Sequence, residues 1–343
     1  MILHYTDIQV DRYSRFDMKT ESGYGLRIDN IIACAEWIAE EIRTRKPKIV
    51  INGGDTNNSI GVVSSEALSA IGKCISLINQ ACDSVGAEHM ILLGNHDMGI
   101  LSNSVTSIDH LESLSEVTLV TEPCEFLVGK EKFGMVPYSH DSNYTRDAIL
   151  TLMANGCKMV FTHLDFDGFR FNAVKSSECD LKPTGFSDDF QIINGHYHIY
   201  QKVGNVLCPG SCIQHKYSEY SEKRGILWIK EDLVPELIQN MVSPILKKVN
   251  SLKQLRESNL PDSSYVYIDY NPLIDKTEDV NKEMDRFARV IINMSSSSIQ
   301  MKSLGTKIEG DSPDELFQNF IQNNYETELN KSDLERLGLE QLH

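Results

Sequence analysis

Five short motifs in the sequence bring together side chains of the types that bind metal ions. Carboxylate and carboxamide oxygens combined with imidazole nitrogens form a mixed site that suits manganese, iron, zinc or magnesium. A single aspartate or histidine of this kind is most often a hydrogen-bonded cap, whereas five such motifs in series predict a metal centre. The motifs are Asp7-Ile8-Gln9, Gly54-Asp55, Gly94-Asn95-His96-Asp97, Thr162-His163 and Gly195-His196-Tyr197-His198.

Each motif follows a short apolar run of the type that forms a buried strand. Between the first three runs, apolar residues recur at helical spacing over 28–42 and 68–78, which gives a βαβαβ pattern. This pattern predicts an α/β fold with a mixed or parallel sheet covered by helices. Strands of such a sheet direct their carboxyl ends to one crevice, so we expect the motifs to meet there. The predicted strands are 2–5, 48–51, 90–93, 158–162, 190–194 and 225–230, with hairpins at 124–137 and 200–208.

A second, smaller domain is predicted at residues 233–298, after an α/β domain that spans residues 1–232. Residues 265–270 alternate as a strand does, 279–289 can form a helix, and 290–294 form another apolar run. We therefore expect a small α+β capping domain.

The last segment, residues 299–343, is predicted to be a linker followed by two short helices. Ser312-Pro313-Asp314-Glu315 and Ser332-Asp333-Leu334-Glu335 both have the pattern of a helix N-cap with a capping box. Each opens an amphipathic stretch that is too short to bury much apolar surface by itself. From the pattern alone, this helix-loop-helix either packs on the body of the protein or binds a partner.

Composition favours an ordinary globular protein, with 41% hydrophobic and 24% charged residues. We expect a cytoplasmic protein, because the sequence has neither a membrane-length apolar run nor a signal-peptide pattern at its start. The eight cysteines contain no close pair of the metal-binding type, and we expect buried, reduced thiols. The net charge of −16 argues against binding nucleic acid by bulk electrostatics, although residues 305–343 hold nine acidic and three basic side chains.

The order of the five motifs resembles that of the calcineurin-like metallophosphoesterase superfamily, over about residues 1–230. The resemblance implies a sheet sandwich covered by helices and a two-metal site. Two cations about 3.5–4 Å apart can activate a water molecule and neutralise charge on a phosphoryl group. It also implies the ligands: Asp7 and His198 for one metal, Asn95, His163 and His196 for the other, Asp55 bridging both, and His96 as a proton donor with Asp97 as its orienting partner.

The first motif departs from the superfamily pattern, because Gln9 stands where histidine is usual. A glutamine carbonyl can bind a hard cation, but it binds borderline metals less well than imidazole does. We therefore expect Gln9 to be a weaker ligand and the site to favour manganese, with magnesium as the alternative.

Several further residues make the sequence resemble the SbcD nuclease subunit, and more closely the phage nuclease subunits related to it. They are residues 162–169, Pro209-Gly210-Ser211 and Arg224-Gly225, together with the predicted cap and tail. The resemblance implies a DNA nuclease of repair and recombination, with exonuclease activity on duplex ends and endonuclease activity on single strands. It implies a homodimer, in which residues 64–84 and 104–115 are candidate contacts, and an SbcC-like ATPase partner bound by residues 312–342. The compact length favours a phage origin.

Two other functions remain open at this stage. The acidic composition and the D-x-Q motif favour a stand-alone, manganese-dependent nucleotide diphosphatase, while the cap and tail oppose it. Gln9 alone favours a catalytically weak scaffold that recruits an ATPase to DNA.

We predict that Gln9→His keeps or raises phosphoesterase activity in manganese, because imidazole is the better ligand for a borderline metal. Initial rates of the two proteins over a manganese titration test this. A large loss of activity in the variant would show that the amide has a role that histidine cannot fill.

Overall fold

The computed structural model describes residues 1–12, 17–99, 105–113, 117–171, 175–187, 189–219, 223–270, 282 and 286–294. The chain divides into two compact units, Met1–Asn293 and Met294–His343. The predicted helix-loop-helix at 312–342 and most of the predicted helix at 279–289 lie outside the described residues.

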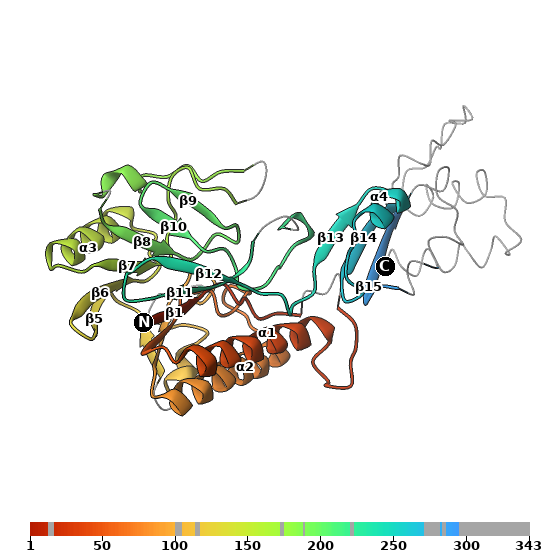
Figure 1. Cartoon of the computed structure of the whole chain (residues 1–343), viewed down its shortest axis with the longest axis horizontal. Helices are drawn as coiled ribbons and strands as arrows, with labels where there is room; N and C mark the ends of the chain where they lie inside the picture. The colour runs from red at the N-terminus through yellow and green to blue at the C-terminus, as the bar shows by residue number, and fades with distance from the viewer. Residues whose placement is uncertain are drawn as a thin grey trace, which may run out of the picture. The chain divides into compact units, whose positions relative to one another are not determined.

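Two six-stranded sheets carry the first unit (Figure 1). The strand order of the first sheet is β12-β11-β1-β2-β3-β4. Strands β1 to β4 run parallel to one another, β11 is antiparallel to β1, and β12 is antiparallel to β11. Its strands are β1 (Ile2–Tyr5), β2 (Ile49–Asn52), β3 (Glu88–Leu92), β4 (Val117–Val120), β11 (Gly225–Ile229) and β12 (Pro235–Gln239).

The second sheet has the order β5-β6-β7-β8-β10-β9, with a parallel centre and an antiparallel hairpin at each edge. Both predicted hairpins are confirmed, and Gly129 and Gly204 at their turns have the positive φ that favours glycine. The strands are β5 (Cys124–Val128), β6 (Glu131–Val136), β7 (Met159–Thr162), β8 (Gln191–Asn194), β9 (Gln201–Val203) and β10 (Val206–Cys208).

The two sheets pack face to face and helices cover their outer faces. Ile51 and Leu92 of the first sheet belong to the same buried cluster as Phe161 and Ile193 of the second. The outer face of the first sheet packs against α1 (Leu26–Arg45) and α2 (Ser65–Val85), and α3 (Ser142–Ala154) packs on the second sheet (Figure 1). The predicted α/β sandwich covered by helices is therefore confirmed.

The boundary predicted at residue 232 is wrong, because β12 pairs with β11 along its whole length and so extends the first sheet to Gln239. After it, β13 (Leu246–Val249), β14 (Tyr265–Tyr270) and β15 (Arg289–Met294) form a separate small sheet with α4 (Leu252–Glu257). The predicted strands at 265–270 and 290–294 are present. Short 3-10 helices lie at η1 (Asp109–Ser113), η2 (Pro183–Gly185) and η3 (Tyr217–Glu219).

All eight cysteines are free and six of them are buried, whereas Cys124 and Cys179 are partly exposed. The expected burial of the thiols therefore holds for most of them. None of the helices among the described residues has the length and apolar character needed to cross a membrane.

Buried histidines make the stability of this fold sensitive to acid. His89 on β3 is fully buried, and its Nε2 forms a hydrogen bond with the Tyr5 hydroxyl at 3.0 Å. Burial lowers its pKa from 6.5 to about 3. Between these two values the unfolded chain binds a proton that the native chain does not, so the free energy of unfolding falls as pH falls.

We predict that His89→Gln reduces this loss of stability between pH 6.5 and pH 4. A group of this kind changes the free energy of unfolding by up to about 1.4 kcal/mol per pH unit. Urea denaturation at several pH values measures the slope, and the exposed His110→Gln is the matched control. An unchanged slope in His89→Gln would contradict the prediction.

Candidate metal centre

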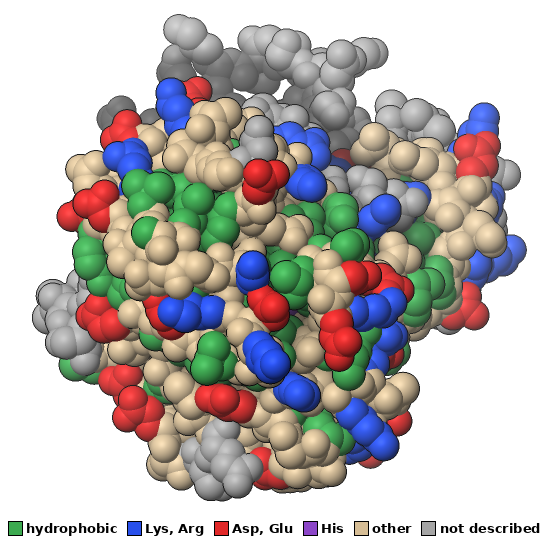
Figure 2. Space-filling view, turned by 60° about the vertical axis from the view of Figure 1, so that its left-hand side comes forward, with side chains coloured by type: hydrophobic (Ala, Val, Ile, Leu, Met, Phe, Trp, Pro, Cys, Tyr) green, Lys and Arg blue, Asp and Glu red, His purple; other side chains and the backbone are tan. Residues whose placement is uncertain are grey.

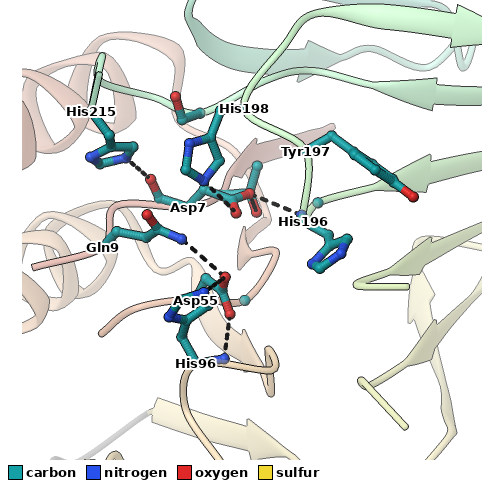
Figure 3. Close-up of polar contacts among 12 residues, drawn as sticks. Asp7, Gln9, Asp55, His96, His196, Tyr197, His198 and His215 are labelled. Carbon is teal, nitrogen blue, oxygen red and sulfur yellow. Dashed lines mark hydrogen bonds and ion pairs between the residues drawn. The ribbon is translucent and has the colours of Figure 1, made fainter. Parts of the chain in front are cut away.

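The side chains of all five motifs meet at one edge of the sandwich. Asp7, Asp55 and Asn95 follow β1, β2 and β3 of the first sheet, while His163 and His196 follow β7 and β8 of the second. Because the two sheets pack with their parallel centres together, the loops after these strands converge (Figure 3). The expected convergence at the carboxyl ends of the strands is therefore present.

The loops reach this edge by means of unusual backbone conformations. Asp7, Gln9, Asp55 and His196 have φ angles of 53°, 43°, 53° and 75°. They are four of the seven non-glycine residues with positive φ in the described part of the chain. Such conformations cost free energy and gather at functional sites, where the surrounding structure holds them in place.

Glycines allow the loops to approach one another. A Cβ atom on Gly94 would lie 2.3 Å from the backbone nitrogen of Asp55. One on Gly54, whose φ is 101°, would lie 2.4 Å from Nδ1 of His163. The glycines in the G-N-H-D and G-D motifs are thus required by the close packing of the loops after β2, β3 and β7.

Asp55, Asn95, His163 and His196 form the first group of ligand candidates, here called the Asp55 group. Single ligand atoms of Asp55, His163 and His196 all lie within 4.8 Å of one another. Nε2 of His163 lies 3.3 Å from Oδ1 of Asp55, and Oδ1 of Asn95 lies 2.9 Å from Nδ1 of His196. Oxygen and nitrogen donors therefore surround one small volume, as a cation requires.

Asp7, Gln9 and His198 form the second group, the Asp7 group (Figure 3). Nε2 of His198 lies 3.8 Å from Oδ1 of Asp7. The side-chain amide nitrogen of Gln9 donates to Oδ2 of Asp55 at 3.1 Å, which links the two groups. A metal-ligand role for Gln9 requires the opposite amide orientation, with its oxygen turned towards the cation.

The Asp7 carboxylate provides a test of whether these residues fit a metal ion. Its Oδ2 accepts hydrogen bonds from the Thr6 hydroxyl at 2.6 Å and from the backbone of His196 at 3.1 Å. Its Oδ1 is buried and has no hydrogen-bond partner. A buried carboxylate oxygen without a donor is costly unless a cation balances it. Asp7 therefore fits the ligand role that the sequence predicts.

Glu219 on η3 supports His198, and no motif in the sequence points to it. Its Oε1 accepts a hydrogen bond from Nδ1 of His198 at 3.0 Å, which leaves Nε2 directed at Asp7. Burial opposes ionisation of Glu219, but the hydrogen bond and the charge of His198 lower its pKa to about 2. A carboxylate that holds a ligand histidine fixes its tautomer and its orientation.

Three more contacts hold the ligand candidates in place. The Gly53 carbonyl accepts from Nδ1 of His163 at 2.7 Å, and Asp165 accepts from Nε2 of His196 at 2.9 Å. Nε2 of His215 donates to the backbone carbonyl of Asp7 at 2.8 Å, and its ring lies 4.9 Å from that of His198. Asp165 stands two residues after His163, and this spacing was the one available sequence signal for any of them.

Asp55 and His163 are electrostatically coupled. Burial opposes the protonated form of His163, but the Asp55 carboxylate raises its pKa to about 9. Burial also opposes ionisation of Asp55, yet the charge of His163 holds its pKa well below the usual range. A metal ion that binds Nε2 of His163 must replace that proton, so metal affinity rises with pH.

Asp97 does not contact the His96 ring as the sequence analysis expected. Its carboxylate accepts hydrogen bonds from the backbone of Thr56, Asn57 and Gly94, at 3.3, 3.0 and 3.1 Å. Burial and the charge of Asp55 raise its pKa to about 7. Asp97 thus joins the loops after β2 and β3, whereas Nδ1 of His96 donates to the Asn58 carbonyl.

Comparison with known proteins finds two similar viral proteins, and the chain matches no model of a known protein family. It is 25% identical over 256 residues to "Putative phosphoesterase 244L" of Invertebrate iridescent virus 6, which covers 72% of this chain and 86% of that protein. It is 31% identical over 159 residues to "Putative phosphoesterase 078R" of Invertebrate iridescent virus 3, which covers 42% and 44%.

Among solved structures, a dimetal phosphatase from Danio rerio covers 60% of this chain and 85% of its own, with 9% identity and a TM-score of 0.36. That likeness is too weak to carry an argument. The two viral relatives bear names that agree with the chemistry of the ligand set.

We predict that Glu219→Gln weakens manganese binding by about ten- to a hundred-fold, because the variant loses the charge that orients His198. Isothermal titration with manganese chloride measures the affinity. Glu236→Gln, at an exposed position of strand β12, is the matched control and should bind as the unaltered protein does. Equal affinities in the two variants would mean that Glu219 does not support the Asp7 group.

Proposed function

We propose that this metal-dependent phosphoester hydrolase cleaves DNA, as the nuclease subunit of a complex similar to SbcC–SbcD. Phosphoester hydrolysis is supported above all by the meeting of the Asp55 and Asp7 groups around one small volume. The DNA part rests on the resemblance of residues 162–169, 209–211 and 224–225 to SbcD-type subunits and on the small sheet that follows the sandwich.

The two groups divide between two cations, which we propose are manganese, with magnesium as the alternative. Asn95, His163 and His196 would hold one ion, Asp7, His198 and Gln9 the other, and Asp55 both. Two such ions supply a nucleophile at neutral pH and balance the charge of the phosphoryl group in the transition state. Glu219, Asp165 and the Gly53 carbonyl keep the three histidines in the orientation that this requires.

His96 is the residue best placed to protonate the leaving oxygen. Its backbone nitrogen donates to Oδ1 of Asp55 at 2.9 Å, and its ring Nε2 lies 3.9 Å from Oδ2. The side chain is 28% exposed, so a substrate can reach it. Because the Asn58 carbonyl binds Nδ1, Nε2 is the nitrogen that faces the reacting phosphate.

The distribution of charge supports a role for the small sheet in DNA binding. Residues 244–294 hold eight basic and eight acidic side chains and are therefore neutral, whereas the whole chain has a net charge of −16. Over the described part of the face in Figure 2, acidic and basic side chains are intermixed. A protein of this kind gains little affinity for DNA from its sandwich alone, which favours a partner that supplies basic surface.

That partner, in our proposal, is an SbcC-like ATPase that binds residues 312–342. We also propose a homodimer with residues 64–84 and 104–115 as candidate contacts. The viral sources of both relatives support a virus-encoded protein. We propose a phage protein that acts in the cytoplasm of its host.

A stand-alone nucleotide diphosphatase is the second candidate. The net charge of −16 favours it, since a small substrate depends less on long-range attraction to a basic surface than DNA does. A scaffold without activity is the third candidate, and it depends on Gln9 being unable to hold a metal.

We predict that the purified protein degrades labelled linear DNA in manganese and that Asp55→Asn abolishes the degradation. The variant keeps the volume of the side chain but removes the charge that joins the Asp55 group. The assay also offers ADP-ribose, and both substrates are tested with and without an SbcC-like ATPase and ATP.

Hydrolysis of ADP-ribose alone would favour the diphosphatase. Cleavage of neither substrate under any of these conditions would favour the scaffold. Circular dichroism of Asp55→Asn shows whether a loss of activity reflects a loss of fold.

A further inference from the structure

A cavity of about 380 Å³ lies directly beside the proposed metal centre. Asp165 lines it and also binds His196, while Leu164 lines it and follows His163 in the chain. This volume lies in the range of about 300–1,000 Å³ typical of pockets that hold small organic groups. A phosphate held between the Asp55 and Asp7 groups would therefore present one of its ester groups to this cavity.

Tyr138 provides an aromatic wall between the cavity and the histidines. Its backbone nitrogen donates to the carbonyl of Leu93 at 3.0 Å, which joins the end of β6 to the loop that carries Asn95. Its ring is half-buried, and the ring centroids lie 6.0 Å from His196 and 6.5 Å from His163. A flat ring fixed to both sheets and lining an open cavity is suited to stack on a nucleobase.

The charge of the cavity limits what can occupy it. Its lining includes the carboxylates of Asp165, Glu178 and Asp180, together with His140, and holds no lysine or arginine among the residues that the structure describes. Arg146 lies outside the lining, where it donates to the backbone carbonyl of Asp180. A further phosphate would face three carboxylates there, whereas the amino and hydroxyl groups of a nucleoside can donate hydrogen bonds to them.

We propose that this cavity binds the nucleoside attached to the phosphate under attack, with its base stacked on Tyr138, and that its carboxylates exclude a second phosphate. This inference rests on the proposed function and adds a substrate subsite to it. Tyr138 is a specificity residue here, because it recognises the group next to the reacting atoms and takes no part in bond cleavage.

The test compares two diesters that share a leaving group, thymidine 5′-(p-nitrophenyl phosphate) and methyl p-nitrophenyl phosphate, in manganese. The unaltered protein should have a higher kcat/KM for the thymidine diester. Tyr138→Ala should lower the ratio of the two kcat/KM values by roughly ten-fold, since a stacked base is lost. Tyr138→Phe should restore the ratio. Tyr144→Ala, an exposed tyrosine outside this cavity, is the matched control.

The outcomes separate the subsite from the proposed function. If the protein cleaves both diesters and the ratio of the two kcat/KM values in Tyr138→Ala equals that of the unaltered protein, the subsite is overturned while the phosphodiesterase stands. Cleavage of neither diester overturns the proposed function and the subsite together.

The excluded phosphate has its own test. A thymidine diester with an additional 3′-phosphate should be a poor substrate, and Glu178→Gln with Asp180→Asn should raise its kcat/KM several-fold relative to the thymidine diester without that phosphate. Both substitutions leave Asp165 and its contact with His196 intact. No relative gain in the double variant would overturn the charge-based part of the proposal.

Discussion

The contacts of the Asp55 carboxylate hold the centre together. It lies after β2, yet it meets the backbone of His96 after β3, the amide of Gln9 after β1 and the ring of His163 after β7. One buried side chain thus joins three loops of the first sheet to one of the second. Because Gly94 packs against Asp55 and Gly54 packs against His163 without side chains, the two sheets approach closely at this edge.

Buried charges and unfavourable backbone conformations lie close together in this centre, and both lower the stability of the fold. Asp7, Asp55 and Asp97 are all buried, and several ligand candidates have left-handed backbone conformations. The ion pair with His163 offsets part of the cost for Asp55, and backbone amides do so for Asp97. The remaining carboxylate oxygen, Oδ1 of Asp7, accepts no hydrogen bond and has only the ring of His198 at 3.8 Å, which is the strongest structural argument for a cation.

The sequence predicts the sandwich and the ligand set because both depend on local patterns. Buried parallel strands are short apolar runs, the helices between them repeat every three or four residues, and each motif stands where a strand ends. The supporting residues depend on contacts between distant segments. Glu219 and His198 are twenty-one residues apart in the sequence, and His215 and Asp7 are two hundred and eight apart. The periodicity of apolar residues cannot predict contacts between such pairs.

The same distinction explains the two errors. Residues 235–239 form strand β12 because β11 offers an edge to pair with, and their own alternation is weak. Asp97 follows His96 in the chain, which suggested a contact, but a residue buried beneath a turn meets the amides of that turn first.

Substrate choice depends on features that lie outside the motifs. The ligand residues do not by themselves select one phosphoester over another, so selectivity must come from the walls around them. Tyr138 offers a surface for a base, and the carboxylates of Glu178 and Asp180 disfavour a continuing chain of phosphates on that side. A long polyanion must then leave the centre in another direction, and residues 244–294, which carry no net charge, repel it less than the rest of this acidic chain does.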